Sequence, residues 1–65
     1  MMVKVLIADD HKIVREGLKM LVENHPNMKV VGLARNGRDA LDLALMLVPD
    51  VIIMDITMQI GRAHV

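Results

Sequence analysis

The sequence has no cysteine and no phenylalanine, tyrosine or tryptophan among its 65 residues. Without cysteine the chain can form neither disulfide bonds nor a thiolate zinc site, so packing or self-association must stabilise it. A chain of this length lies in the range where one hydrophobic core barely offsets the conformational entropy lost on folding. The sequence therefore predicts one domain, or part of one.

Net charge is also absent, because eight basic residues balance eight acidic residues. Nucleic-acid-binding domains usually carry an excess of positive charge, which this sequence does not have, so we expect no DNA contact from these residues. The longest uncharged stretch, Leu43–Pro49, is far too short to cross a bilayer. The first residues pass directly into a strand pattern without a small-residue cleavage site, so we expect no signal peptide, no membrane contact and a cytoplasmic location.

Two apolar runs end on acidic residues. The run Val3–Ala8 is followed by Asp9 and Asp10. The segment Asp50–Thr57 contains four consecutive apolar residues and then Asp55. Because a run that is apolar at every position is typical of a parallel strand covered on both faces, we expect two buried strands that carry three carboxylates at their C-terminal ends.

Helical spacing of apolar residues fills the stretch His11–Asn24, and Pro26 follows where a proline stops a helix. We expect the core face of this helix to consist of Ile13, Val14, Gly17, Leu18, Leu21 and Val22. The next segment, Met28–Arg35, is rich in β-branched residues and favours a strand. Within it, Gly32 indicates close backbone packing.

A second helix is expected from Asn36 to about Val48. Asn36 is a candidate N-cap, and Asp39 suits the positive end of the helix dipole. Pro49 ends the helix. The apolar spacing predicts a core stripe on one face and leaves two apolar residues outside it. The expected stripe is Ala40, Leu41, Ala44, Leu47 and Val48, with Leu45 and Met46 outside.

The resulting element order is β-α-β-α-β, which indicates an α/β fold with parallel strands. Because parallel crossovers are right-handed, a chain that moves one way and then returns gives strand order 2-1-3, with one helix on each face. Strands 1 and 3 then meet at a topological switch point, and ligands bind at the carboxyl ends there. This topology places Asp9, Asp10 and Asp55 at one crevice.

Three carboxylates within several ångströms repel one another, so such a group either raises a pKa or recruits a cation. Mg²⁺ suits a site with few oxygen ligands, and an aspartate beside it can act as a nucleophile toward phosphorus. The alternative is that the acids are solvated loop residues, with Asp10 only capping the first helix. His11 follows the two acids, but a solvated histidine at a helix start is the more common case.

Three segments carry a resemblance to a known family: Val-Leu-Ile-Ala-Asp-Asp-His at 5–11, Val-Val-Gly-Leu-Ala-Arg-Asn-Gly at 30–37, and Pro-Asp-Val-Ile-Ile-Met-Asp-Ile at 49–56. They resemble the receiver domain of bacterial two-component response regulators. The similarity is greatest to the subfamily in which a LuxR-type helix-turn-helix output domain follows the receiver. The resemblance implies a partial flavodoxin-like (receiver) fold and a parent protein that regulates transcription.

The same resemblance implies residue roles. Asp55 would be the phosphoacceptor, which receives its phosphoryl group from a sensor histidine kinase. Asp10 and Asp55 would be ligands of Mg²⁺, Asp9 would act mainly through water, and the backbone carbonyl of Thr57 would be a further ligand. The domain would be a regulatory phosphoacceptor and not an enzyme.

The chain departs from the family after Met58. We interpret residues 1–58 as the N-terminal half of a receiver domain, and residues 59–65 as a tail that resembles no receiver segment, such as a truncation junction or a cloning scar. The family's later strands, its hydroxyl residue and its lysine are not in the sequence, so we expect impaired phosphotransfer. DNA contact would come from an output domain that the sequence does not include.

Two other functions stay open at this point. A haloacid-dehalogenase-like phosphohydrolase would use Asp55 as its nucleophile, but it predicts a second acid where Thr57 stands. A passive half-domain would self-associate without phosphotransfer. In either the receiver or the passive case, we expect a homo-oligomer formed through the edge of the third strand, at Val51–Met54.

Overall fold

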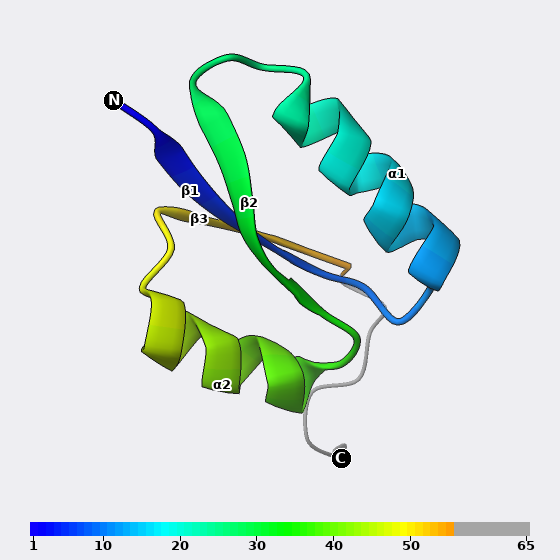
Figure 1. The fold of residues 1–65 in the computed structure, drawn as a ribbon. Coiled ribbons are helices and arrows are strands. Elements are labelled where there is room, and N and C mark those ends of the chain that lie inside the picture. The colour runs from blue at the N-terminus through cyan, green and yellow to red at the C-terminus, as the bar shows by residue number, and fades with distance from the viewer. Residues whose placement is uncertain (56–65) are drawn as a thin grey trace.

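The computed structural model describes residues 1–55, which form strands and helices in alternation (Figure 1). The elements are β1 (Val3–Ala8), α1 (Lys12–Glu23), β2 (Met28–Ala34), α2 (Gly37–Leu47) and β3 (Val51–Met54). This order confirms the predicted β-α-β-α-β arrangement. Neither helix in the described part of the chain is long and apolar enough to cross a bilayer.

The strands form a parallel sheet in the order β2-β1-β3, which confirms the predicted order 2-1-3. Figure 1 shows α1 and α2 on opposite faces of this sheet, as two right-handed crossovers in opposite directions require. Ala8 at the end of β1 pairs with both Ala34 and Met54. The three strands therefore end level with one another, and the residues that follow β1 and β3 leave the sheet at the same edge.

The core lies on both faces of β1. Val5, Leu6 and Ile7 are fully buried. On one face Val5 and Ile7 pack with Val22 of α1, and on the other Ala8 packs against α2. Burial of side chains of this size stabilises a fold by about 1.5–3 kcal/mol each. The prediction of a strand covered on both faces is confirmed for β1.

The same prediction is only partly right for β3. In the part of the chain that the structure describes, β3 pairs with β1 alone and lies at the sheet edge. Val51 and Ile52 are 43% and 45% exposed, whereas Ile53 and Met54 pack against the two core clusters. The apolar run therefore predicted the strand correctly but overstated its burial.

The core face of α1 differs from the predicted face. Val22 is buried and Leu18 packs beside it, but Ile13 is 86% and Leu21 is 66% exposed. The helix is rotated so that Arg15 also faces inward, and its guanidinium Nη1 donates to the carbonyl of Asp9, 2.8 Å away. The aliphatic stem of an arginine can cover apolar surface while its charged end forms such a bond.

The N-cap predicted for α2 is confirmed. The Asn36 side-chain oxygen accepts a hydrogen bond from the Asp39 backbone N–H at 2.8 Å, which satisfies one of the free donors of the first turn. At the other end Val48 adopts the left-handed conformation, with φ 47°, and its N–H donates to the carbonyl of Ala44. The helix thus ends just before Pro49, as predicted.

The inner face of α2 centres on Ala40 and Leu43, whereas Leu41 and Val48, which were predicted to be buried, are 57% and 68% exposed. The two residues predicted to lie outside the stripe, Leu45 and Met46, are exposed.

Gly32 explains which face of α2 packs against the sheet. A Cβ at this glycine would lie 2.9 Å from Leu47 Cδ1, 3.1 Å from Leu6 Cδ1 and 3.6 Å from Leu43 Cδ1. The missing side chain leaves space on β2 that the two leucines of α2 fill, so the expectation of close packing at Gly32 is confirmed. The strand also has a bulge here, because Val5 pairs with Val30 and Leu6 with Gly32.

Candidate functional site

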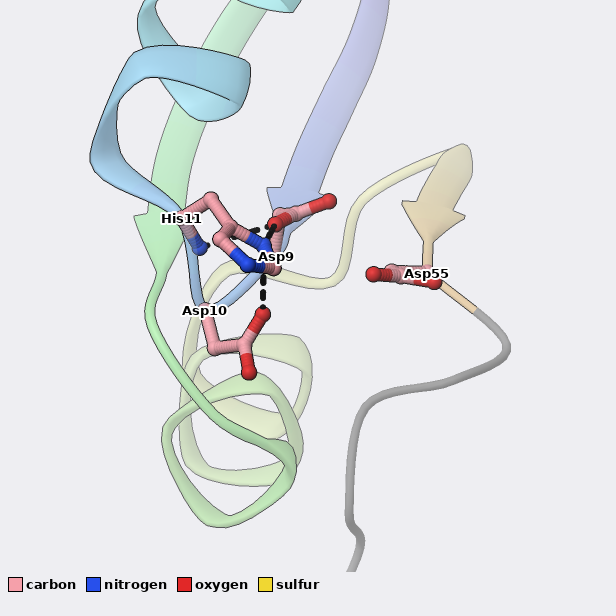
Figure 2. Close-up of side chains that lie close together, drawn as sticks. All are labelled: Asp9, Asp10, His11 and Asp55. Atoms are coloured by element: carbon pink, nitrogen blue, oxygen red, sulfur yellow. Dashed lines mark hydrogen bonds and ion pairs between the residues drawn. The ribbon is translucent and has the colours of Figure 1, made fainter.

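The candidate site lies at the carboxyl edge of the sheet, where β1 and β3 end. Asp9 and Asp10 follow β1, Asp55 follows β3, and His11 precedes the first turn of α1 (Figure 2). One ligand atom from each of these four side chains can be chosen so that all lie within 4.8 Å of one another. The structure therefore brings together the three acids that the topology placed at this crevice, and adds a histidine to them.

Asp9 is the most firmly held of these residues, and it is only 5% exposed. Its Oδ1 accepts a hydrogen bond from the His11 backbone N–H at 2.8 Å. Its own N–H donates to the Ala34 carbonyl, 3.0 Å away, and its carbonyl accepts the bond from Arg15. The interpretation of the acids as solvated loop residues is therefore wrong for Asp9.

Asp10 and Asp55 occupy more open positions. The Asp10 side chain is 53% exposed and faces the ring of His11. Asp55 is partly buried, and its backbone N–H donates to the Ala8 carbonyl at 3.2 Å, which extends the pairing of β3 with β1 by one residue. This bond fixes where the Asp55 side chain leaves the sheet. Thr57, the remaining predicted ligand, lies outside the described residues.

The His11 side chain is 67% exposed, as expected for a histidine at a helix start, but its ring points back into the acidic cluster. Its ring Nδ1 lies 2.9 Å from Asp10 Oδ1 and 3.1 Å from Asp9 Oδ1. Dashed lines in Figure 2 mark the contacts among these residues. The hydrogen bond to the Asp9 carboxylate and then the negative charge of Asp10 raise the pKa of His11 above its ordinary value of 6.5. Its place directly after two acids was the signal for this contact.

Sequence reasoning also missed Arg15, which is not among the residues predicted for the core face of α1. The bond from the guanidinium to the Asp9 carbonyl joins the second turn of α1 to the β1–α1 loop. A residue of this kind positions the loop without entering the acidic cluster. No local sequence pattern indicates this contact, because it depends on how α1 is rotated against the sheet.

The donor set fits a hard divalent cation. Carboxylate oxygens are the ligands that Mg²⁺ prefers, and a Mg²⁺ site typically uses one or two of them together with water and phosphate oxygens. Here they come from two adjacent strands and approach one another closely enough for their charges to repel. A cation at this point would offset that repulsion, which the ring of His11 reduces in the structure.

Comparison with known proteins agrees with this arrangement. The family described as response regulator receiver domain matches residues 5–61. The transcriptional regulatory protein YdfI of Bacillus subtilis is 53% identical over 55 residues, which cover 85% of this chain and 26% of that protein. Protein-glutamate methylesterase/protein-glutamine glutaminase 2 of Carboxydothermus hydrogenoformans is 48% identical over 56 residues, which cover 86% of this chain and 16% of that protein.

Among solved structures, a two-component response regulator of the LuxR family from Aurantimonas sp. matches with a TM-score of 0.86 and 34% identity. The match covers 98% of this chain and 45% of that one.

A parallel sheet in the order β2-β1-β3, with functional side chains at its switch point, defines the class of open α/β domains that bind ligands at the carboxyl ends of their strands. Within that class, this chain belongs to the response regulator receiver domain family. Receiver domains bind Mg²⁺ at an acidic pocket, and the group of Asp9, Asp10, His11 and Asp55 is one that could hold a metal ion. The match also extends to residue 61, three residues past the boundary expected at 58. The chain spans about a quarter of YdfI and less than half of the solved LuxR-family chain.

Proposed function

We propose that Asp55 accepts a phosphoryl group from a sensor histidine kinase in the cytoplasm, with Mg²⁺ held by Asp9, Asp10 and Asp55. The observation that supports this proposal most strongly is the meeting of carboxylates from two strands, with ligand atoms within 4.8 Å. The carbonyl of Thr57, as a further ligand, remains part of the proposal.

The chemistry requires one nucleophile and charge compensation. A carboxylate oxygen of Asp55 forms a bond to phosphorus while the bond from phosphorus to the kinase histidine nitrogen breaks, which leaves an acyl phosphate on Asp55 and a free imidazole on the kinase. Mg²⁺ would supply positive charge to the transferring phosphoryl oxygens. Asp9 keeps the β1–α1 loop in place through its bonds to His11 and Arg15, and so positions Asp10 opposite Asp55.

Magnesium titration of the whole chain tests the site. We expect Asp10→Asn and Asp55→Asn each to weaken Mg²⁺ binding in calorimetry, because each change removes one charged ligand. Asp42→Asn is the matched control, since Asp42 is an exposed acid on α2 that forms a surface ion pair with Arg38. Binding that is as tight in both site variants as in the control would refute the metal site.

Incubation with acetyl phosphate and Mg²⁺ tests the phosphoacceptor. We expect intact-mass analysis to show one added phosphoryl group, absent in Asp55→Asn and after removal of Mg²⁺. The reaction should be slower than that of a full receiver, because the family's hydroxyl residue and lysine are not in this sequence. Loss of one such stabilising group commonly raises the transition-state free energy by about 3 kcal/mol. Modification that persists in Asp55→Asn would assign the phosphoryl group to another residue.

For the whole protein we propose a transcription regulator with a DNA-binding output domain, and not an enzyme. The similarity to YdfI and to a LuxR-family regulator supports this choice. The similarity to a methylesterase supports the competing choice of an enzymatic output. The gene sequence past the codon for Met58 distinguishes them, because we expect it to encode a helix-turn-helix domain. A methylesterase domain in that place would refute the proposal.

We further propose that the chain self-associates through the edge of β3. Val51 and Ile52 are half exposed and uncharged, whereas the other sheet edge, β2, carries a bulge and the charged residue Lys29, both of which discourage pairing. Two β3 edges that pair antiparallel would form a continuous sheet with two-fold symmetry. We expect light scattering to show a dimer, and Ile52→Lys to give monomers.

Leu45→Lys is the matched control for this experiment, because Leu45 is an exposed leucine on α2, away from the sheet edge. It should leave the dimer intact. A folded monomer at high concentration in the unsubstituted chain would refute self-association.

A further inference from the structure

We propose that His11 is a nitrogen ligand of the metal site, so that the site binds a borderline transition-metal ion such as Zn²⁺ more tightly than Mg²⁺. The inference rests on the metal site proposed above and adds to it a ligand and a class of metal. It starts from the position of the ring, which reaches both carboxylates that follow β1.

The distances are those of neighbouring ligands around one ion. In an octahedral site with metal–ligand bonds of about 2.1 Å, adjacent ligand atoms lie about 3.0 Å apart, and in a tetrahedral zinc site about 3.4 Å. His11 Nδ1 lies 2.9 Å from Asp10 Oδ1 and 3.1 Å from Asp9 Oδ1. Small movements of these three groups would therefore complete a set of neighbouring ligands.

The backbone holds His11 in the required place. Its N–H donates to Asp9 Oδ1, the same oxygen that the ring approaches, so the ring and the carboxylate form a short closed loop. The His11 carbonyl accepts a helical bond from Arg15, and Arg15 in turn binds the Asp9 carbonyl. The position from which the imidazole extends is therefore fixed by the start of α1.

The nitrogen changes which metals the site prefers. Carboxylate oxygens suit Mg²⁺, Ca²⁺ and Mn²⁺, whereas imidazole suits Zn²⁺ and later transition metals, and affinity for such mixed donor sets rises along the series toward Cu²⁺ and Zn²⁺. A site with carboxylates and one imidazole should thus bind Zn²⁺ more tightly than Mg²⁺. The competing explanation is that His11 makes only surface ion pairs with Asp9 and Asp10, in which case metal preference would not depend on its nitrogen.

The test uses Zn²⁺ as the probe, in a chain from which the two other histidines have been removed. The sequence has three histidines, so a chain with His25→Asn and His64→Asn leaves His11 as its single imidazole. In this chain we expect Zn²⁺ to shift the ¹⁵N resonance of His11 Nδ1. Because changes of outer-sphere partners alone alter metal affinity about 10- to 100-fold, we expect loss of this ligand in His11→Asn to weaken Zn²⁺ binding by at least about tenfold.

Asparagine is a favourable residue at a helix N-cap, so the fold should persist in His11→Asn. Unchanged Zn²⁺ affinity in His11→Asn, or an Nδ1 resonance that does not respond to Zn²⁺, would overturn the inference. The outcome is separable from the proposed function: if Mg²⁺ binding still depends on Asp10 and Asp55, the receiver site stands and only the role of His11 is refuted.

Discussion

Replacement of Gly32 by alanine tests how closely α2 packs on the sheet. The new Cβ would lie 2.9 Å from Leu47 Cδ1 and 3.1 Å from Leu6 Cδ1. Carbon atoms in favourable contact are about 3.5–4.0 Å apart, so both methyl groups must move. Leu6 is fully buried and has little free space, whereas Leu47 lies at the end of α2 and can move at lower cost.

The expected magnitude follows from two opposing effects. Overpacking of this kind destabilises a protein by about 1–3 kcal/mol. Replacing a glycine in a strand by alanine also stabilises the folded state by about 0.5–1 kcal/mol, because the unfolded chain then loses less conformational entropy on folding. The difference between these two effects spans about 0–2.5 kcal/mol, so we expect Gly32→Ala to lower the free energy of unfolding by about 1 kcal/mol. Gly32→Val should lower the free energy of unfolding further, because it adds two more methyl groups to the same space.

Gly17→Ala is the matched control, because a Cβ at Gly17 in the middle of α1 would meet nothing within 4 Å. The same substitution should there stabilise the chain by about 0.5–1 kcal/mol. Urea unfolding followed by circular dichroism measures both changes, at one fixed protein concentration because self-association would alter the apparent stability. A Gly32→Ala variant that is stabilised as much as Gly17→Ala would show that α2 does not approach β2 as closely as the structure has it.

Three further predictions concern the helix cap, the histidine and the core. Asn36→Ala should lower the free energy of unfolding by about 1 kcal/mol, and Asn36→Ser should restore most of it, as measured by urea unfolding. NMR titration should give His11 a pKa above its ordinary 6.5, which falls when Asp10→Asn removes a neighbouring charge. Because this pKa is raised on folding, the contribution of His11 to stability should be complete below pH 6.5 and lost as pH rises through the folded-state value; a His11 pKa at or below 6.5 would contradict this. Leu6→Ala should destabilise the chain by about 2–5 kcal/mol or unfold it, whereas Leu45→Ala at an exposed site should change stability by less than about 0.5 kcal/mol. Similar effects of the two leucine changes would refute the assignment of the core.

The sequence by itself determined the elements, their order and the meeting of the acids. Apolar runs and helical spacing are local properties, and Pro26 and Pro49 mark where each helix must end. The right-handed crossover rule then leaves one arrangement of three parallel strands. Since parallel strands end level at one edge, Asp9 and Asp55 had to come together once that order was known.

Only the tertiary structure decided which faces are buried and where His11 points. Helical spacing marked Ile13 and Leu21 as core, but α1 turns Leu18 and Val22 toward the sheet instead, and Arg15 bonds to the β1–α1 loop. That rotation depends on contacts between segments far apart in the chain, which a local pattern does not contain. The ring of His11 likewise reaches the acids because the Asp9 carboxylate binds the backbone at the start of α1, an interaction that exists only after the loop has folded.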